Sequence, residues 1–342
     1  MRAIQYTQVA ELPELVDLPE PECPVDGAVL AVRATGVCRS DWHAWRGHDP
    51  VPLPMVPGHE FAGEIVRIGP LVRDFRIGDR VTAPFVNGCG ECPECRGGNA
   101  QVCPHQTQPG FTHHGSFAEQ VVVRQADFNL VRLPDQVDYL TAAALGCRFA
   151  TSFHALTRQA ELRAGEWLLV LGCGGVGLSA VMIGKALGAR VIAVDPAPAA
   201  RRRATELGAG HVLAAADPDI IGELSGGGVQ VSLDALGSAA TAAAGVRSLR
   251  RRGRHIQVGL MLDANADAGL PWGPVVAREL QVLGSHGMAA TDYPQLLELI
   301  ADGRLNPSVL VGKVVGLEQA GLELAAMDAP AQTAGLVVAR VS

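Results

Sequence analysis

Hydrophobic and polar positions follow one pattern up to about Phe149 and a different pattern beyond it. In the first part, short β-type runs such as residues 29–32 and 61–66 are bounded by glycine and proline, and 14 of the 22 prolines precede Cys147. Short runs punctuated in this way are typical of β-strands joined by loops. The first part is therefore predicted to be a small, loop-rich β domain.

The second part of the chain predicts strands and helices in alternation. Residues 168–171 and 191–194 are continuously apolar, as strands buried on both faces of a parallel sheet should be. Leu178, Val181 and Met182 recur at helical spacing between these two runs. Together with later candidates, six strands predict a doubly wound parallel sheet. The later candidate strands are residues 212–213, 229–233, 255–258 and 280–283.

Composition narrows the class of protein and of partner. The chain has 342 residues, of which 48% are hydrophobic, so two domains with separate cores are expected. The net charge of −7 disfavours a nucleic acid or an anionic membrane surface as the main partner. The first residues lack the apolar core of a signal peptide, and five glycines interrupt the long uncharged stretch 167–184. We expect a cytoplasmic protein that acts on a small molecule.

A nucleotide-binding motif opens the second part of the chain. Gly172-Cys173-Gly174-Gly175-Val176-Gly177 follows a predicted buried strand, precedes a predicted helix and lies 18 positions before Asp195. Gly172 permits a tight turn, Gly174 lets the backbone approach a pyrophosphate, and Gly177 lets the helix pack on the strand. Asp195 would accept hydrogen bonds from a ribose hydroxyl and repel a 2′-phosphate. This favours NAD over NADP, although the arginines at 201–203 could offset Asp195.

Four cysteines form a close cluster with the spacing C-x2-C-x2-C-x7-C: Cys89, Cys92, Cys95 and Cys103. Four thiolates suit a tetrahedral zinc ion with no vacant position, so a structural zinc site is predicted. An iron–sulfur cluster is one alternative for four cysteines. A zinc ribbon that reads nucleic acid is another, but the acidic balance and the neighbouring Glu91 and Glu94 disfavour it.

Three further potential metal ligands lie outside this cluster. Cys38 begins the segment Cys38-Arg39-Ser40-Asp41-Trp42-His43, His59 is followed by Glu60, and Cys147 lies just before the pattern changes. Two thiolates and one imidazole would leave the fourth position of a zinc ion open for water or substrate. Taken singly, a cysteine or histidine is more often structural, so this prediction depends on the three occurring together.

Together these motifs resemble those of one family. Cys38-x2-Asp41, Gly58-His59-Glu60-x2-Gly63-x5-Gly69, the four-cysteine cluster and the glycine turn occur in the order found in the zinc-containing medium-chain alcohol dehydrogenases. The resemblance runs nearly end to end. It implies an α/β plus β fold, with a GroES-like β-rich catalytic domain and a Rossmann doubly wound NAD-binding domain. The catalytic domain would comprise residues 1–148 and 286–342, and the Rossmann domain residues 149–285.

The resemblance also implies a role for each residue near the open metal position. The ligands of a catalytic zinc ion would be Cys38, His59 and Cys147. Glu60 is an alternative ligand, and Asp41 would orient the zinc-binding histidine and fix its tautomer.

Proton transfer and cofactor binding are implied in the same way. Ser40 would take the substrate proton, and His43 would pass it to solvent. Many family members carry a Gly-Arg pair near the C-terminus where this chain has Gly335-Leu336, so Arg39 is expected to contribute more of the pyrophosphate contact. Besides the glycine turn and Asp195, the implied cofactor contacts are Arg39, Thr151, Val176 and Val258.

By this resemblance, we expect reversible hydride transfer between a primary or secondary alcohol and NAD, with zinc as a Lewis acid. Cys147 favours simple alcohols, because polyol dehydrogenases of the superfamily often lack the third ligand cysteine; a polyol or amino-alcohol is the alternative. The rivals are a zinc-free reductase of the same fold and a non-catalytic NAD- or zinc-sensing protein. A homo-oligomer, tetramer rather than dimer, is expected. Candidates for an apolar substrate pocket, or equally for the core, are Trp42, Trp45, Phe85, Phe111 and Leu260.

Overall fold

The computed structural model describes residues 1–262, 269–329 and 335–341. They form two compact units, Met1–Ala150 with Gly287–Ser342, and Thr151–His286. The second unit is thus an insertion in the sequence of the first. No helix within the described ranges has both the length and the apolar character to cross a membrane.

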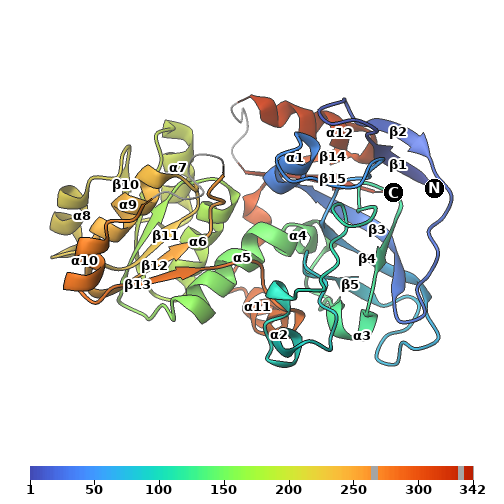
Figure 1. The fold of residues 1–342 in the computed structure, drawn as a ribbon, viewed down its shortest axis with the longest axis horizontal. Coiled ribbons are helices and arrows are strands. Elements are labelled where there is room, and N and C mark those ends of the chain that lie inside the picture. The colour runs from blue at the N-terminus through green and yellow to red at the C-terminus, as the bar shows by residue number, and fades with distance from the viewer. Residues whose placement is uncertain (263–268, 330–334, 342) are drawn as a thin grey trace. The chain divides into compact units, whose positions relative to one another are not determined.

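The second unit contains a six-stranded sheet in which all described pairings are parallel (Figure 1). The spatial order is β10-β9-β8-β11-β12-β13, which is the 3-2-1-4-5-6 order of a doubly wound sheet and confirms that prediction. Arg250–Arg252 lie in β12 with exposed side chains. The strands are β8 (Trp167–Leu171), β9 (Arg190–Val194), β10 (His211–Leu213), β11 (Val229–Asp234), β12 (Leu249–Gln257) and β13 (Gln281–Gly284).

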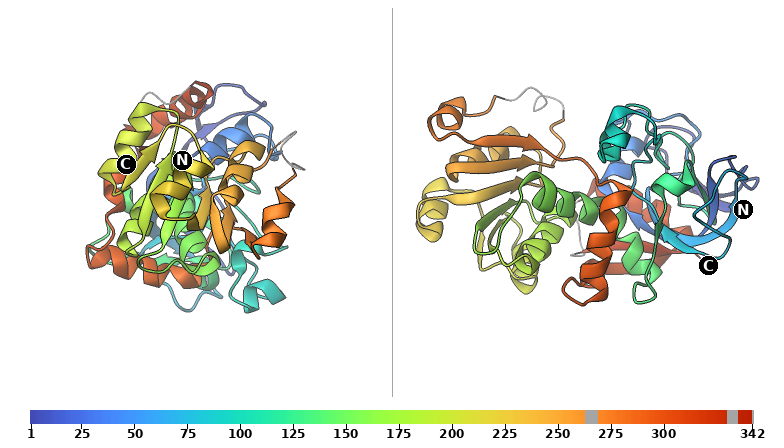
Figure 2. Two further views of the ribbon diagram at one scale, coloured as in Figure 1. Left: turned by 90° about the vertical axis from the view of Figure 1, so that its left-hand side faces the viewer. Right: turned by 90° about the horizontal axis from the view of Figure 1, so that it is seen from below.

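Helices lie on both faces of this sheet (Figure 2). Helix α6 packs against α7, whereas α9 packs against α8 and α10. Apolar side chains from β8 and β9, among them Leu169, Leu171 and Ile192, form the buried core. The helices are α5 (Ala150–His154), α6 (Gly175–Ala186), α7 (Pro198–Glu206), α8 (Pro218–Ser225), α9 (Ala239–Arg247) and α10 (Trp272–Ala277).

The first unit is built on a mostly antiparallel seven-stranded sheet. Strand β3 pairs with β4, β6 and β15, so the C-terminal strand completes the sheet that the N-terminal part begins. A Cβ atom at Gly63 would lie 2.1 Å from the carbonyl oxygen of Ala31, so close strand pairing requires this glycine. The strands are β3 (Ala28–Val37), β4 (Glu60–Ile68), β5 (Arg80–Thr82), β6 (Gln120–Val123), β7 (Val131–Arg132), β14 (Val311–Gly316) and β15 (Leu336–Arg340), and a separate hairpin comprises β1 (Arg2–Gln5) and β2 (Glu14–Asp17).

Short helices surround this sheet, and α1 carries the predicted site residues Arg39, Ser40, Asp41 and His43. Large buried side chains such as Tyr6, Phe61 and Phe117 fill the core. A π-helical turn, Leu145–Phe149, follows α4. The helices are α1 (Arg39–Trp45), α2 (Pro93–Arg96), α3 (Ala126–Asn129), α4 (Tyr139–Ala143), α11 (Tyr293–Ala301) and α12 (Leu317–Ala325).

Candidate active site and metal sites

The ends of two paired strands and one π-helical turn bring three potential metal ligands together. Cys38 follows β3, His59 precedes β4, and these strands are antiparallel neighbours. The π-helical turn adds Cys147. Their two sulfurs and one imidazole nitrogen lie within 4.8 Å of one another. The three side chains proposed for the open site therefore form one cluster, in which Cys38 and His59 are buried and Cys147 is half-buried. Cys147 lies on a type of helical turn that is frequent at functional sites.

Asp41 fixes the geometry of this cluster. Its Oδ1 accepts hydrogen bonds from His59 Nδ1 at 2.8 Å and from Gly58 N at 3.0 Å, and its Oδ2 accepts one from Cys38 N at 3.1 Å. Because the carboxylate accepts the hydrogen bond from Nδ1–H, Nε2 of the neutral His59 ring is the nitrogen whose lone pair can bind a metal ion. Nε2 is buried and has no hydrogen-bond partner among the described residues. An unpaired buried nitrogen is costly, and a metal ion would satisfy it.

The two sulfurs of the cluster share charge unequally. A hydrogen bond from the Cys147 thiol holds the pKa of Cys38 well below its usual range, and the same bond raises the pKa of Cys147 well above its own. A divalent cation would stabilise both as thiolates. Two sulfurs and one imidazole fit zinc with one position open, so the donor set suits the predicted metal.

Ser40 and His43 lie on α1 beside the cluster. The Ser40 hydroxyl is 3.9 Å from the Cys38 sulfur. Nδ1 of His43 is 3.2 Å from Nδ1 of the exposed His48, which the sequence did not single out. Gly47, with φ of +78°, helps the chain fold back so that these two rings meet. Burial, followed by repulsion from His48, lowers the pKa of His43, which keeps the imidazole neutral near pH 7.

Two of the five residues considered for a substrate pocket lie beside the cluster. The rings of Phe85 and Phe111 are buried, and their centroids lie 5.9 and 5.4 Å from that of His59. They provide apolar walls next to the metal ligands. Of the other three, Trp45 is buried in the core of the first unit, Trp42 donates a hydrogen bond to Asp328, and Leu260 is exposed on the second unit.

Glu60 has a partner that sequence reasoning missed. Its fully buried carboxylate forms an ion pair with the guanidinium of Arg148, which follows Cys147 in the chain. Burial raises the pKa of Glu60, and the charge of Arg148 opposes this shift. An arginine next to a predicted ligand carries no sequence signal of burial, so only the fold reveals this pair.

The four-cysteine cluster closes around a second potential metal position. The four sulfurs lie within 4.8 Å of one another. Backbone amides turn toward them: Cys103 Sγ accepts from Cys89 N at 3.4 Å and from His105 N at 3.3 Å. The amide of Glu91 lowers the pKa of Cys89 to about 6, whereas burial raises that of Cys92 to about 12. Four simultaneous thiolates therefore require a cation, and a tetrahedral set of sulfurs suits zinc.

The glycine motif has the geometry that its sequence predicted. Gly172 has φ of +90°, and a Cβ atom at Gly177 would lie 1.8 Å from the carbonyl oxygen of Gly172. Both positions therefore need glycine for the turn itself. Gly174 caps the N-terminus of α6, and a Cβ atom there would meet nothing within 4 Å. The N-terminus of α6 is thus accessible to an anionic group.

Asp195, directly after β9, is held beside this turn. Its carboxylate accepts hydrogen bonds from Cys173 N at 2.9 Å and from Ala197 N at 2.8 Å. Two of the neighbouring arginines have other partners. Arg201 donates to the carbonyl oxygens of Asp195 and Pro196, and Arg203 pairs with Glu206 at 2.7 Å.

The remaining cofactor candidates are distributed over both units. In the second unit, the Val176 carbonyl accepts a hydrogen bond from Ser152 Oγ, the Val258 amide donates to Asp234, and Thr151 is buried. In the first unit, Arg39 donates to the carbonyl oxygen of Met327 at 2.7 Å, and its guanidinium lies 4.6 Å from the centre of the Trp42 ring. Their contacts with a cofactor stay predictions.

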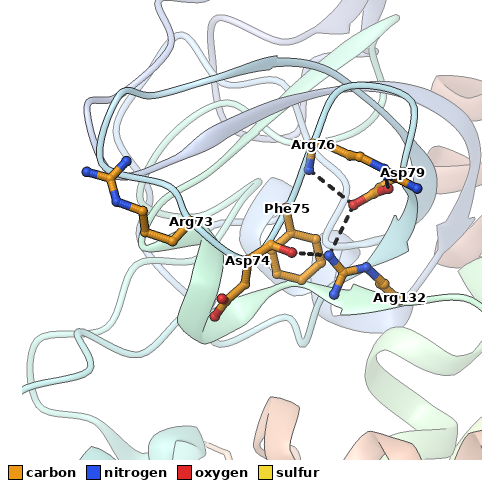
Figure 3. A pocket seen from close by; sticks show the side chains of 6 residues that line it. All are labelled: Arg73, Asp74, Phe75, Arg76, Asp79 and Arg132. Carbon is orange, nitrogen blue, oxygen red and sulfur yellow. Dashed lines mark hydrogen bonds and ion pairs between the residues drawn. The ribbon is translucent and has the colours of Figure 1, made fainter.

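A surface cavity of about 230 Å³ lies apart from these residues (Figure 3). Arg132 stacks over Phe75 and bonds to Asp79 and to the carbonyl of Asp74. Arg76 also pairs with Asp79, and none of the predicted site residues lines the cavity. Its lining is Arg73, Asp74, Phe75, Arg76, Asp79 and Arg132.

Known proteins are similar to this chain in sequence and in fold. Residues 25–135 match the family described as alcohol dehydrogenase GroES-like domain, and residues 175–302 match zinc-binding dehydrogenase. A D-arabitol-phosphate dehydrogenase of Enterococcus avium is 33% identical over 90% of this chain and 87% of its own. A sorbitol dehydrogenase of Halalkalibacterium halodurans is 33% identical over 86% of each chain. The structure of alcohol dehydrogenase TADH from Thermus sp. ATN1 superposes with a TM-score of 0.92, at 29% identity and full coverage of both chains.

Proposed function

Because the chain belongs to the zinc-containing medium-chain dehydrogenase/reductase family, whose alcohol and polyol dehydrogenases it resembles along most of its length, we propose that it oxidises primary or secondary alcohols with NAD and catalyses the reverse reduction. The observation that carries the proposal is the cluster of Cys38, His59 and Cys147. Their ligand atoms lie within 4.8 Å, and His59 Nε2 lacks a partner within the described part of the chain.

In this proposal, Cys38, His59 and Cys147 hold zinc, which supplies a Lewis acid that polarises the substrate oxygen. Asp41 keeps Nε2 of His59 available by binding Nδ1. Ser40 accepts the substrate proton at Oγ, and neutral His43 takes it onward at a ring nitrogen. The buried rings of Phe85 and Phe111 exclude water from the space beside His59. NAD bound to the second unit would supply the hydride acceptor.

The second unit supplies the cofactor site. The accessible N-terminus of α6 would bind the pyrophosphate, and Asp195 would bind the adenosine ribose. Arg201 and Arg203 are engaged by other groups, so neither is poised for a 2′-phosphate. NAD is therefore the proposed cofactor. The four-cysteine cluster is proposed to hold a second, structural zinc ion that stabilises its lobe.

Apolar walls favour simple alcohols as substrates. Phe85 and Phe111 offer no hydrogen bonds to additional hydroxyl groups, and unpaired substrate hydroxyls would lose their solvation. A polyol or amino-alcohol is the second candidate, supported by the similarity to arabitol-phosphate and sorbitol dehydrogenases.

The test is a panel of alcohols, polyols and amino-alcohols followed at the NADH absorbance, with NAD and NADP in parallel. We expect the highest kcat/KM with apolar primary or secondary alcohols and at least about a tenfold preference for NAD. Turnover of polyols alone would move the substrate to the second candidate. Cofactor binding without turnover of any compound would favour an NAD-sensing protein over an enzyme.

Replacing His43 with asparagine tests the proposed proton path. The lowered pKa keeps His43 neutral at pH 7, and protonation at lower pH would remove its ability to accept a proton. His43→Asn should therefore reduce kcat for alcohol oxidation about a hundredfold at pH 7, with recovery as hydroxide becomes available at higher pH. His211→Asn, in the second unit, is the control. A pH profile of His43→Asn parallel to that of the unchanged protein would exclude this role.

The exposed edge of the second unit's sheet and the free cysteines support proposals about the oligomeric state and the cellular compartment. Strand β13 ends the six-stranded sheet, and the preceding α10 exposes Trp272 and Val276, at 61% and 77%. An open strand edge beside apolar side chains favours pairing between copies, and we propose a homo-oligomer, tetramer rather than dimer. Light scattering should give a multiple of 35.7 kDa. All eight cysteines are free thiols, which suits a reducing cytoplasm.

A further inference from the structure

Four donors converge on the carboxylate of Glu60. Its Oε1 accepts hydrogen bonds from Cys147 N, Arg148 N and Arg148 Nε, each at 3.2 Å. Its Oε2 accepts one from Arg148 Nη2. The guanidinium therefore donates hydrogen bonds to both carboxylate oxygens, in the bidentate geometry that arginine, but not lysine, provides. The two backbone amides belong to the π-helical turn that carries Cys147.

This ion pair is buried beside the metal ligands. Glu60 is fully buried and follows His59 in the chain, and Arg148, at 9% exposure, follows Cys147. Buried charges need a partner, since the cost of leaving a carboxylate unpaired there is high. Two thiolates and the carboxylates of Glu60 and Asp41 carry four negative charges, of which a divalent ion and one guanidinium balance three. Arg148 thus supplies one of the positive charges that the buried site requires.

The space around the carboxylate is also restricted. A Cβ atom at Gly36 would lie 2.5 Å from Glu60 Oε2, and one at Gly146 would lie 3.1 Å from Glu60 Cα. Two glycines therefore form the pocket that accommodates the ion pair. Carboxylates are ordinary zinc ligands, so a Glu60 side chain without this restraint could compete for the fourth metal position.

We infer that Arg148 is a positioning residue that holds Glu60 away from the metal and so keeps the substrate position open. The inference rests on the proposed function, because it concerns the same metal. It assigns Arg148 no contact with substrate or cofactor. Its effect passes through Glu60, so removing the carboxylate as well should cancel the effect of removing the arginine.

Cobalt-substituted protein gives a readout that does not depend on turnover. The visible d–d and thiolate charge-transfer bands report the ligands of the cobalt ion, and imidazole serves as the probe of the open position. For Arg148→Gln, we expect altered d–d bands and about tenfold weaker imidazole binding, together with a higher KM for alcohol. In the double variant Glu60→Gln/Arg148→Gln, the bands and imidazole affinity should return to within about twofold of the unchanged protein.

A matched control separates this effect from the loss of any partly buried ion pair. Arg254 and Glu166 in the second unit pair at 2.6 Å with side-chain exposures of 18% and 17%. Arg254→Gln should leave the cobalt bands and imidazole affinity unchanged. If Arg148→Gln does not accumulate as folded protein, Arg148→Lys replaces it, because lysine keeps the positive charge and loses the bidentate contact with Glu60. We then expect smaller changes in the cobalt bands and in imidazole affinity, in the same direction.

Bands and imidazole affinity of the Arg148 variant equal to those of the unchanged protein would overturn the inference. So would a double variant as impaired as the single one, since Arg148 would then act independently of Glu60. Failure of the proposed function would give a different experimental result. Thiolate–cobalt bands without oxidation of any alcohol would refute the activity, while the comparison of variants would still decide the role of Arg148.

Discussion

His59→Ala and Cys38→Ser are each expected to abolish alcohol oxidation while leaving NAD binding intact. His59 is fully buried, its Nδ1 is bound to Asp41, and its Nε2 has no partner among the described residues. Removal of one of three ligands should release the metal, and with it the Lewis acid that polarises the substrate oxygen. We expect kcat/KM to fall at least about a thousandfold, with about one fewer zinc ion per chain.

This result should be specific to the metal site, because the metal ligands and most of the proposed cofactor groups belong to different units. The proposed cofactor groups around Gly172 and Asp195 lie in the compact unit Thr151–His286, whereas Cys38 and His59 lie in the other. NADH binding, measured by fluorescence titration, should therefore change less than about threefold. Cys23→Ser, at a half-buried thiol outside both clusters, is the matched control and should keep turnover and metal content. Near-normal turnover in either ligand variant would refute the assignment of the open site.

Cys103→Ser is expected to release a different zinc ion and to lower thermal stability. The lobe around the four cysteines has little apolar core: its buried members are Cys92, Cys95, Ala100, Cys103 and Ala289. Most of its cohesion would therefore come from the metal, as in other small metal-stabilised folds. Differential scanning calorimetry should show Tm lowered by at least about 5 °C.

The cobalt bands distinguish this variant from a ligand variant of the open site, because both variants should lose about one metal ion per chain. Cys103→Ser should lose about one zinc ion per chain and keep the cobalt bands of the Cys38 cluster, because the two clusters share no ligand. An unchanged zinc content with unchanged Tm would mean that the four sulfurs hold no structural metal. Iron and inorganic sulfide in the unchanged protein would instead indicate an iron–sulfur cluster.

Features that follow a hydrophobic pattern or a fixed residue spacing could be predicted from the sequence, because local chemistry specifies them. Continuous apolar runs such as 168–171 became β8, and the glycine turn has the positive φ at Gly172 and the close approach at Gly177 that its motif requires. Strand β12 was harder to predict, because Arg250–Arg252 interrupt its apolar pattern while lying exposed in the strand.

Contacts that depend on tertiary structure could not be predicted. Arg148 is a charged residue that the sequence offers no reason to bury, and it is buried because the π-helical turn places it against Glu60. His48 meets His43 through a backbone reversal at Gly47. The substrate wall shows the same limit: Phe85 and Trp45 are similar apolar candidates in sequence, but only Phe85 lies beside His59.

Anomalous diffraction at the zinc edge from crystals of the protein as purified tests the central claim most directly. We expect two peaks per chain, one enclosed by the four cysteine sulfurs and one bonded to Cys38 Sγ, His59 Nε2 and Cys147 Sγ with a non-protein ligand in the fourth position. A peak at the four-cysteine cluster alone, from fully loaded protein that still oxidises alcohols, would contradict the account.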